Sequence, residues 1–187
     1  MDTSSIKYGP GVTREVGYEL RRLGVRRVMV VTDPNLAGSE SVRVALAAIE
    51  AEGVDAALFD QVGVEPTDVS FKEAIGFATD GGFDGYVAFG GGSSIDTAKA
   101  ANLYATYPAD FMTYVNSPVG EGTLVPGPLK PLIAIPTTTG TGSETTGVAI
   151  FDLLEMKAKT GISHRALRPV MGLVDPENTR TLPKMVV

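Results

Sequence analysis

Two short apolar runs in this chain lead directly into turns built from glycine and hydroxyl residues. Residues 86–89 (Tyr-Val-Ala-Phe) precede Gly-Gly-Gly-Ser-Ser at 90–94, and residues 132–135 (Leu-Ile-Ala-Ile) precede Pro-Thr-Thr-Thr-Gly-Thr-Gly-Ser at 136–143. A strand that ends in such a turn before a helix leaves free backbone N–H groups at the positive end of the helix dipole, where they bind anions. Because ligands of parallel sheets lie beyond the carboxyl ends of the strands, the two turns predict two walls of one phosphate pocket.

Neither turn carries a standard nucleotide motif. No Gly-Lys-Ser or Gly-Lys-Thr follows, as in a Walker sequence, and the three spaced glycines of the usual dinucleotide fingerprint are missing. Each turn alone is equally consistent with ordinary turn chemistry, with Ser94 capping the helix that follows. It is the occurrence of both turns in one chain that favours a nucleotide pocket.

Helical and strand patterns alternate along most of the chain. Apolar residues have helical spacing in 12–23, 41–52 and 67–78, and strand-length apolar runs occupy 26–32, 56–59 and 85–89. Strands that are apolar on both faces and separated by helices predict a doubly wound, Rossmann-like α/β domain with a parallel sheet. Residues 105–130 predict a long loop, 147–151 and 159–163 a hairpin, and 169–174 a last strand.

Composition restricts the class of protein further. The 187 residues are 43% hydrophobic and 20% charged, with no cysteine, so we expect one globular domain without disulfides or thiolate metal sites. Sixteen basic against 22 acidic residues give a net charge of −6, which argues against nucleic acid as a partner. No apolar run approaches the length of a membrane span. The start of the chain lacks the pattern of a signal or transit peptide, and the expected location is therefore the cytoplasm.

Few side chains stand out as candidates for chemistry. Asp33 follows a strand at the position where dinucleotide-binding folds hold the adenosine ribose, although Asp-Pro-Asn is equally a good turn starter. His164 is the only histidine and is expected on the surface. Four acidic residues in turn-like contexts are more typical of structure than of a cation site: Asp152, Glu155, Asp175 and Glu177. The sequence therefore predicts no catalytic residue and no metal ligand within this chain.

Four stretches carry a family resemblance. Residues 23–33 (LGVRRVMVVTD), 90–99 (GGGSSIDTAK), 136–144 (PTTTGTGSE) and 172–176 (GLVDP) resemble the iron-containing (group III) alcohol dehydrogenases. The similarity runs from end to end of the chain and implies the N-terminal domain of the dehydroquinate synthase and iron-dependent alcohol dehydrogenase type. Residues 64–68, 99–105, 128–134 and 144–152 are most similar to the hydroxyacid-oxoacid transhydrogenases of that family, which pass a hydride between 4-hydroxybutyrate and 2-oxoglutarate through a bound nicotinamide.

The resemblance also assigns roles to residues. It implies NAD as the cofactor, with Asp33 at the adenosine ribose and Gly91, Gly92 and Ser93 at the pyrophosphate. It places Thr137, Thr138 and Thr146 along the nicotinamide half, with Lys159 as a further cofactor contact. A carboxylate at Asp33 would repel a 2′-phosphate, so we expect NAD(H) rather than NADP(H).

Metal and substrate chemistry is expected elsewhere. In this family iron or zinc is held by an aspartate and three histidines of a helical domain that follows the nucleotide domain. The resemblance implies that residues 1–187 are the NAD-binding domain alone, with that helical domain absent. We expect iron or zinc only in a longer parent protein, an alcohol or hydroxyacid as its substrate, and no turnover by this chain alone.

Two other interpretations remain open from the sequence. One is a non-catalytic nucleotide-binding module, and the other is a metal-independent relative such as a maleylacetate reductase. We also expect a homo-oligomer, because apolar surface should be exposed around Leu173, Leu182 and residues 185–187.

Overall fold

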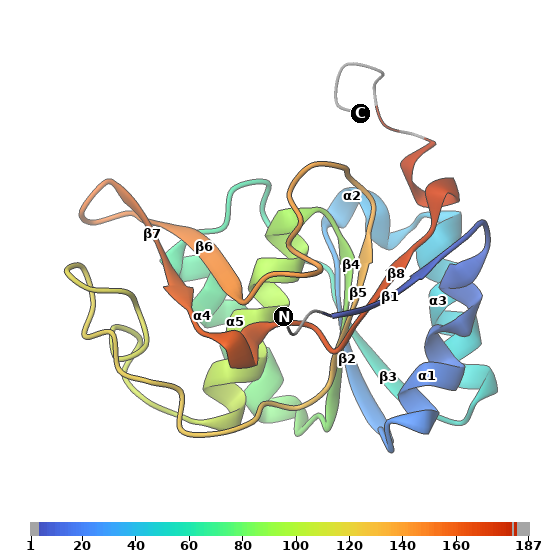
Figure 1. The fold of residues 1–187 in the computed structure, drawn as a ribbon, viewed down its shortest axis with the longest axis horizontal. Helices are drawn as coiled ribbons and strands as arrows, with labels where there is room; N and C mark the ends of the chain where they lie inside the picture. Colours follow the sequence, from blue (N-terminus) through green and yellow to red (C-terminus); the bar gives the residue numbers. More distant parts are fainter. Residues whose placement is uncertain (1–3, 181, 183–187) are drawn as a thin grey trace.

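The computed structural model describes residues 4–180 and 182, and its centre is a six-stranded sheet (Figure 1). The order of the strands is β1-β8-β5-β4-β2-β3, and every neighbouring pair is parallel. The strands are β1 (Ser5–Tyr8), β2 (Arg27–Val31), β3 (Asp55–Phe59), β4 (Gly85–Gly90), β5 (Leu132–Pro136) and β8 (Met171–Val174). The predicted parallel α/β fold is confirmed.

Helices cover both faces of the sheet (Figure 1). On one face lie η1 (Val12–Glu15), α1 (Val16–Arg22) and α3 (Glu40–Ala51), and on the other lie α4 (Asp68–Gly81) and α5 (Gly92–Thr106). The short α2 (Pro34–Ala37) follows β2 at the carboxyl edge of the sheet. The helix expected over residues 12–23 begins as a 3-10 turn and becomes an α-helix only at Val16.

Alternate residues of the central strands separate two apolar cores. In β2, Val28 and Val30 join the core under α1 and α3, whereas Met29 and Val31 join the core under α4 and α5. The strands β4 and β5 are divided in the same way, and all of their residues are buried. Because each face of these strands is buried in one of the two cores, the strands are continuous apolar runs in the sequence.

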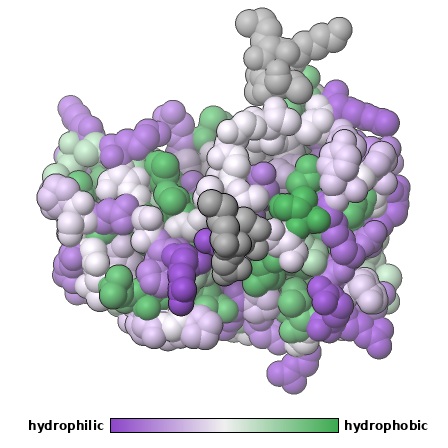
Figure 2. Space-filling view, in the orientation of Figure 1, coloured by the Kyte–Doolittle hydropathy of each residue, from purple (hydrophilic) through white to green (hydrophobic). Residues whose placement is uncertain are grey.

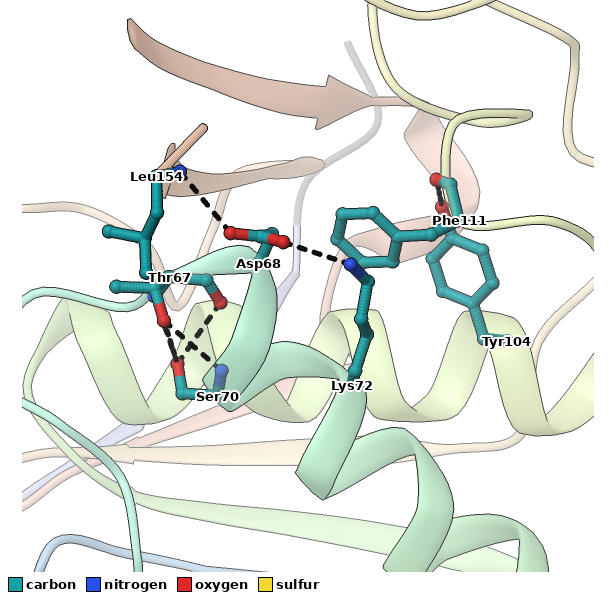
Figure 3. Close-up of polar contacts among 7 residues, drawn as sticks. All are labelled: Thr67, Asp68, Ser70, Lys72, Tyr104, Phe111 and Leu154. Atoms are coloured by element: carbon teal, nitrogen blue, oxygen red, sulfur yellow. Dashed lines mark hydrogen bonds and ion pairs between the residues drawn. The ribbon is translucent and has the colours of Figure 1, made fainter. Parts of the chain in front are cut away.

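A hairpin lies outside the sheet, against α4 and α5. It consists of β6 (Val148–Leu153) and β7 (Ala158–Ser163), which are antiparallel as predicted. Its far end is held to α4 by Asp68, whose carboxylate accepts the backbone N–H of Leu154 at 3.3 Å and pairs with Lys72 at 2.9 Å (Figure 3). The long loop between α5 and β5 packs beside the hairpin and shares a third apolar core with it.

Two features differ from the sequence-based predictions. The edge strand β1 was not predicted, because three of its four residues are exposed and it lacks an apolar run. Leu173, expected on an exposed surface, is completely buried in β8, whereas Leu182 is half-buried and residues 185–187 lie outside the described part. The remaining elements at this end of the chain are the 3-10 turns η2 (Arg165–Leu167) and η3 (Pro176–Thr179).

The surface mixes polar and apolar residues. Figure 2 shows the apolar residues of one face as separate patches among polar ones. The most exposed large apolar side chains belong to Val64, Leu124 and Tyr8. Among the described residues, none of the helices is both long enough and apolar enough to cross a bilayer.

Candidate functional site

The two glycine turns begin side by side at the carboxyl edge of the sheet. In the parallel pair of β4 and β5, Gly90 lies opposite Pro136, and the backbone N–H of Thr137 donates to the carbonyl of Gly90 at 3.0 Å. Both turns therefore leave the sheet at the same level and run past each other. The predicted adjacency of the two turns is correct, and it follows from strand order and register alone.

Little room is left for a side chain where the two turns approach each other. A Cβ added at Gly91 would lie 3.2 Å from Oγ1 and 3.3 Å from Cγ2 of Thr138. A Cβ at Gly92 would lie 3.2 Å from Thr141 and 3.3 Å from the hydroxyl of Ser143. These are tight contacts, so the absence of side chains on the first turn is what allows the second turn to lie so close.

A cavity of about 390 Å³ opens between the two turns and α2. Its volume falls within the range of small-molecule sites. Polar residues at its wall come from three strand ends: Asp33 after β2, Gly91 and Ser93 after β4, and Thr137 and Thr138 after β5. We call this cavity the cleft. The cleft is also lined by four apolar residues: Leu36, Val62, Val64 and Leu182.

The first turn presents free backbone donors to the cleft. Gly91 is the N-cap of the 15-residue α5, and no side chain caps this helix end. The first backbone N–H groups of a helix have no partner within the helix and lie at the positive end of its dipole. An anion that contacts Gly91 and Ser93 in the cleft would be bound by these groups without any basic side chain.

Thr137 supplies a buried hydroxyl at the centre of the site. Only 5% of this residue is exposed, and its side chain forms no hydrogen bond within the described part of the chain. It lines the cleft and also a second cavity of about 460 Å³ on the side of α3. Because Thr137 lines the cleft, its hydroxyl can form a hydrogen bond with an oxygen of a bound ligand.

Asp33 combines a structural role with a position on the cleft. Its Oδ1 accepts the backbone N–H groups of Asn35 at 2.9 Å and Leu36 at 3.1 Å, which makes it the N-cap of α2. Both of these hydrogen bonds end on the same oxygen. The side chain also lines the cleft, so the second carboxylate oxygen is available to a hydroxyl group of a bound ligand.

The second cavity is bordered by a buried carboxylate. Asp175 is 2% exposed and accepts hydrogen bonds from Gly11 N at 3.0 Å, from Thr13 N at 3.1 Å, from the Thr13 hydroxyl at 2.7 Å and from Glu177 N at 3.1 Å. Burial alone would raise the pKa of Asp175, but these hydrogen bonds outweigh burial and lower it. The hydrogen bonds of Asp175 thus connect the end of β8 to η1 and to the turn before it.

Three residues assigned to the cofactor do not line the cleft. The hydroxyl of Thr146 lies 3.4 Å from Nζ of Lys99, and Lys159 forms an ion pair with Asp152 at 3.4 Å on the hairpin. Gly92 faces Thr141 and Ser143 rather than the cavity. The cofactor roles of these three residues remain predictions. Conversely, the sequence did not indicate Leu36 or Asn178, which line both cavities.

The described residues do not fit a metal ion. Within residues 4–180 and 182, no group of three or more His, Asp or Glu side chains is arranged to hold one. Nδ1 of His164 accepts the N–H of Ala166 and caps η2. Glu177 pairs with Arg180, and Asp175 is used by the hydrogen bonds described above.

Comparison with known proteins identifies the family. The family model for iron-containing alcohol dehydrogenase matches residues 3–176. The chain belongs to this family. A relative named hydroxyacid-oxoacid transhydrogenase, mitochondrial, from Xenopus laevis is 55% identical over 188 residues, which cover 100% of this chain and 41% of the relative. The chain thus spans about two fifths of the length of such relatives.

Solved structures of the same family agree with the fold. The crystal structure of 1,3-propanediol oxidoreductase matches with a TM-score of 0.90 and 27% identity, covering 98% of this chain and 47% of that one. Sulfoacetaldehyde reductase from Bifidobacterium kashiwanohense, solved in complex with NAD⁺, matches with a TM-score of 0.89 and 26% identity over 98% of this chain and 47% of that one.

The predicted cytoplasmic location is wrong. The matching hydroxyacid-oxoacid transhydrogenases from Xenopus laevis, Homo sapiens and Dictyostelium discoideum are all named as mitochondrial proteins. The prediction rested only on the first residues of this chain, which spans about two fifths of the length of the relatives from Xenopus laevis and Homo sapiens.

Proposed function

We propose that the cleft binds NAD(H), with the pyrophosphate at the start of α5 and the adenosine ribose at Asp33. The observation that carries this proposal is the contact of Gly91 with Thr138, which brings two hydroxyl-bearing strand ends and an uncapped helix N-terminus to one cavity. A pyrophosphate needs several N–H and O–H donors around its oxygens, and this arrangement offers them without a buried cation.

NAD(H) rather than NADP(H) is the proposed form of the cofactor. Asp33 would accept a hydrogen bond from the 2′-hydroxyl of the adenosine ribose through the oxygen that does not cap α2. A 2′-phosphate at the same place would set like charges against each other. Among the residues that the structure describes, no Arg or Lys lines the cleft to offset that repulsion.

The parent activity that we propose is hydride transfer between an alcohol or hydroxyacid and the nicotinamide, including the exchange between 4-hydroxybutyrate and 2-oxoglutarate. The similarity to hydroxyacid-oxoacid transhydrogenases at 55% identity supports this substrate class. Bound NAD would supply the hydride acceptor at its nicotinamide ring. The residues of this chain bind and orient the cofactor, whereas iron or zinc and its ligands would come from a further helical domain.

The location and the partners of the protein are a further part of the proposal. We propose a mitochondrial location, a small-molecule substrate and assembly with further copies of the chain, and no nucleic-acid or membrane partner. The names of the relatives support the location. The net charge of −6 supports the absence of a nucleic-acid partner.

Titration with nucleotides tests the proposal. NADH, NADPH and ADP-ribose would each be added to the purified chain, with binding followed by nicotinamide fluorescence and calorimetry. We expect saturable binding of NADH, weaker binding of NADPH, and binding of ADP-ribose through the adenosine and pyrophosphate alone. Absence of saturable binding by all three nucleotides would refute the proposed site.

A turnover assay separates binding from catalysis. The chain would be assayed with NAD(H), 4-hydroxybutyrate, 2-oxoglutarate and simple alcohols, with and without Fe²⁺ or Zn²⁺. We expect binding without turnover, because no three-donor metal group exists among the described residues. Robust turnover by the chain alone would instead support a metal-independent reaction, as in a maleylacetate reductase.

A further inference from the structure

Two helices bind the backbone of β6 and of the residue after it through the same arrangement of side chains. In each case a helical aspartate accepts a backbone N–H of β6 or of the residue that follows it, and is paired with a lysine on its own helix. Asp68 of α4 accepts from Leu154 and pairs with Lys72 (Figure 3). Asp96 of α5 accepts from Ile150 at 3.0 Å, and its Oδ1 lies 3.4 Å from Nζ of Lys99. We call these the outer pair, Asp68–Lys72, and the inner pair, Asp96–Lys99.

The two pairs differ sharply in burial. Lys72 keeps 53% of its side chain exposed, whereas the side chain of Lys99 is 0% exposed. Burial lowers the pKa of Lys99 and raises the pKa of Asp96, because both charges are removed from water. Buried pairs of this kind contribute little net stability, since desolvation offsets their attraction. The inner pair therefore calls for an explanation other than stability.

The inner pair holds the end of a segment whose first residues, Thr137 and Thr138, line the cleft. Nζ of Lys99 donates to the carbonyl of Val148 at 2.7 Å and lies 3.4 Å from the hydroxyl of Thr146. An interaction with the side chain of Ser143 partly offsets the effect of burial on the pKa of Asp96. The segment from Thr137 to Gly147 is thus fixed near its end by charged groups on α5.

The same helix carries the other wall. The α5 helix begins at Gly92, and its N-cap Gly91 lies against Thr138 of the second turn. Asp96 and Lys99 lie one and two turns further along α5, on the side that faces β6. The N-terminus of α5 therefore forms the first wall of the cleft, at Gly91. Side chains of the same helix bind the segment that begins with the second wall, at Thr137 and Thr138.

We propose that Asp96 and Lys99 are positioning residues that set the separation of the two walls of the cleft and so the affinity for the nicotinamide half of the dinucleotide. This inference rests on the proposed function, in which residues 137–147 run along that half. ADP-ribose lacks the nicotinamide, so its binding through Asp33 and the start of α5 depends less on the second wall.

A double variant, Asp96→Asn with Lys99→Met, tests the proposal. The introduced asparagine still accepts the N–H of Ile150, and the neutral methionine leaves no unpaired buried charge, so the fold should persist. The contacts of Lys99 with the carbonyl of Val148 and the hydroxyl of Thr146 are lost. We expect the affinity for NADH to fall about tenfold or more, while the affinity for ADP-ribose changes by less than about twofold.

The outer pair provides a matched control, Asp68→Asn with Lys72→Met. This variant removes an aspartate–lysine pair of the same chemistry that is bound to the same hairpin (Figure 3). Neither residue of the outer pair lines the cleft. We expect the affinities for NADH and ADP-ribose to remain as in the unmodified chain. Equal loss for both ligands in the inner variant, or the same loss in both variants, would overturn the positioning role.

Hydrogen exchange gives a readout that needs no nucleotide. Amides of residues 138–147 should exchange at least about tenfold faster in the inner variant than in the outer one, because the segment loses its anchors. Unchanged exchange there would also overturn the proposal. If exchange rises but the unmodified chain binds no nucleotide, the proposed function fails and the positioning of the segment by Asp96 and Lys99 stands.

Discussion

The side chain of Thr138 lies directly against the backbone of Gly91, so that a Cβ on this glycine would be 3.2 Å from the threonine hydroxyl. The two residues are 47 positions apart and belong to turns after neighbouring parallel strands. Gly91 has a φ of −77°, which any residue adopts, so the glycine is not needed for backbone conformation. The small size of Gly91 matters instead, because Thr138 leaves little room for a side chain at this position.

We predict that Gly91→Ala weakens nucleotide binding without unfolding the chain. The added methyl group would push Thr138 or block an oxygen from the N–H groups at the start of α5. Loss of about one such hydrogen bond corresponds to a roughly tenfold higher Kd for NADH. As a control, Gly76→Ala on the exposed side of α4 meets no atom within 4 Å and should add about 0.4 to 1 kcal/mol of stability. An unaltered Kd for NADH in Gly91→Ala would argue against a phosphate at this turn.

We predict that Asp33→Asn reduces the preference for NADH over NADPH. Asparagine caps a helix as well as aspartate does, so α2 should remain intact. The negative charge that would face a 2′-phosphate is removed, and the ratio of the two Kd values should shift by about tenfold or more. Circular dichroism would check the fold, and parallel titrations would give the ratio. A ratio that is the same in the variant and the unmodified chain would contradict the assignment of Asp33 to the ribose.

We predict that Asp175 makes stability depend on pH in acid. Its pKa is lowered in the folded state, so its contribution is complete above the unfolded pKa of about 4 and is lost as pH falls through the lower, folded pKa. Asp175→Asn should lower the free energy of unfolding by about 2 kcal/mol at pH 7, because the buried donors of Gly11 and Thr13 lose a charged acceptor. Denaturant unfolding from pH 7 to pH 2 should show a smaller acid loss in the variant, and parallel curves would disprove the role.

Much of the fold follows from periodicity and strand order. The apolar runs of β2, β4 and β5 are buried on both faces, and this pattern predicts a parallel sheet between helices. Because the carboxyl ends of parallel strands lie at one edge, the adjacency of Gly91 and Thr138 was predictable as well. These inferences need only local pattern and a general rule of topology.

Other parts depend on tertiary context. The strand β1 has no apolar pattern of its own and exists because it pairs with β8 at the opposite end of the sequence. The roles of Asp96 and Lys99 require knowledge of what packs on α5, although one signal was available. Two charges three residues apart in an otherwise uncharged helix indicate a buried pair, because such charges are rarely buried unless they are paired.

We predict, finally, that Glu19 anchors the edge strand β1. Its side chain is 2% exposed and contacts Lys7 of β1 at 2.6 Å and Arg22 at 2.8 Å. Burial alone would raise the pKa of Glu19, but these two cations outweigh burial and lower it. Glu19→Gln should therefore cost about 1 to 2 kcal/mol of unfolding free energy, with faster hydrogen exchange of the β1 amides.

The exposed pair of Arg21 and Glu52 is the control for this prediction. These side chains are 71% and 30% exposed, and Glu52→Gln should change stability by less than about 0.5 kcal/mol because water screens the pair. Equal costs for the two glutamine variants would mean that burial of Glu19 adds nothing to its contact with Lys7. The substitution leaves the backbone pairing of Ser5–Tyr8 with β8 unchanged. If the β1 amides exchange at the same rate in Glu19→Gln as in the unmodified chain, pairing with β8 alone holds the strand, and Glu19 does not anchor it.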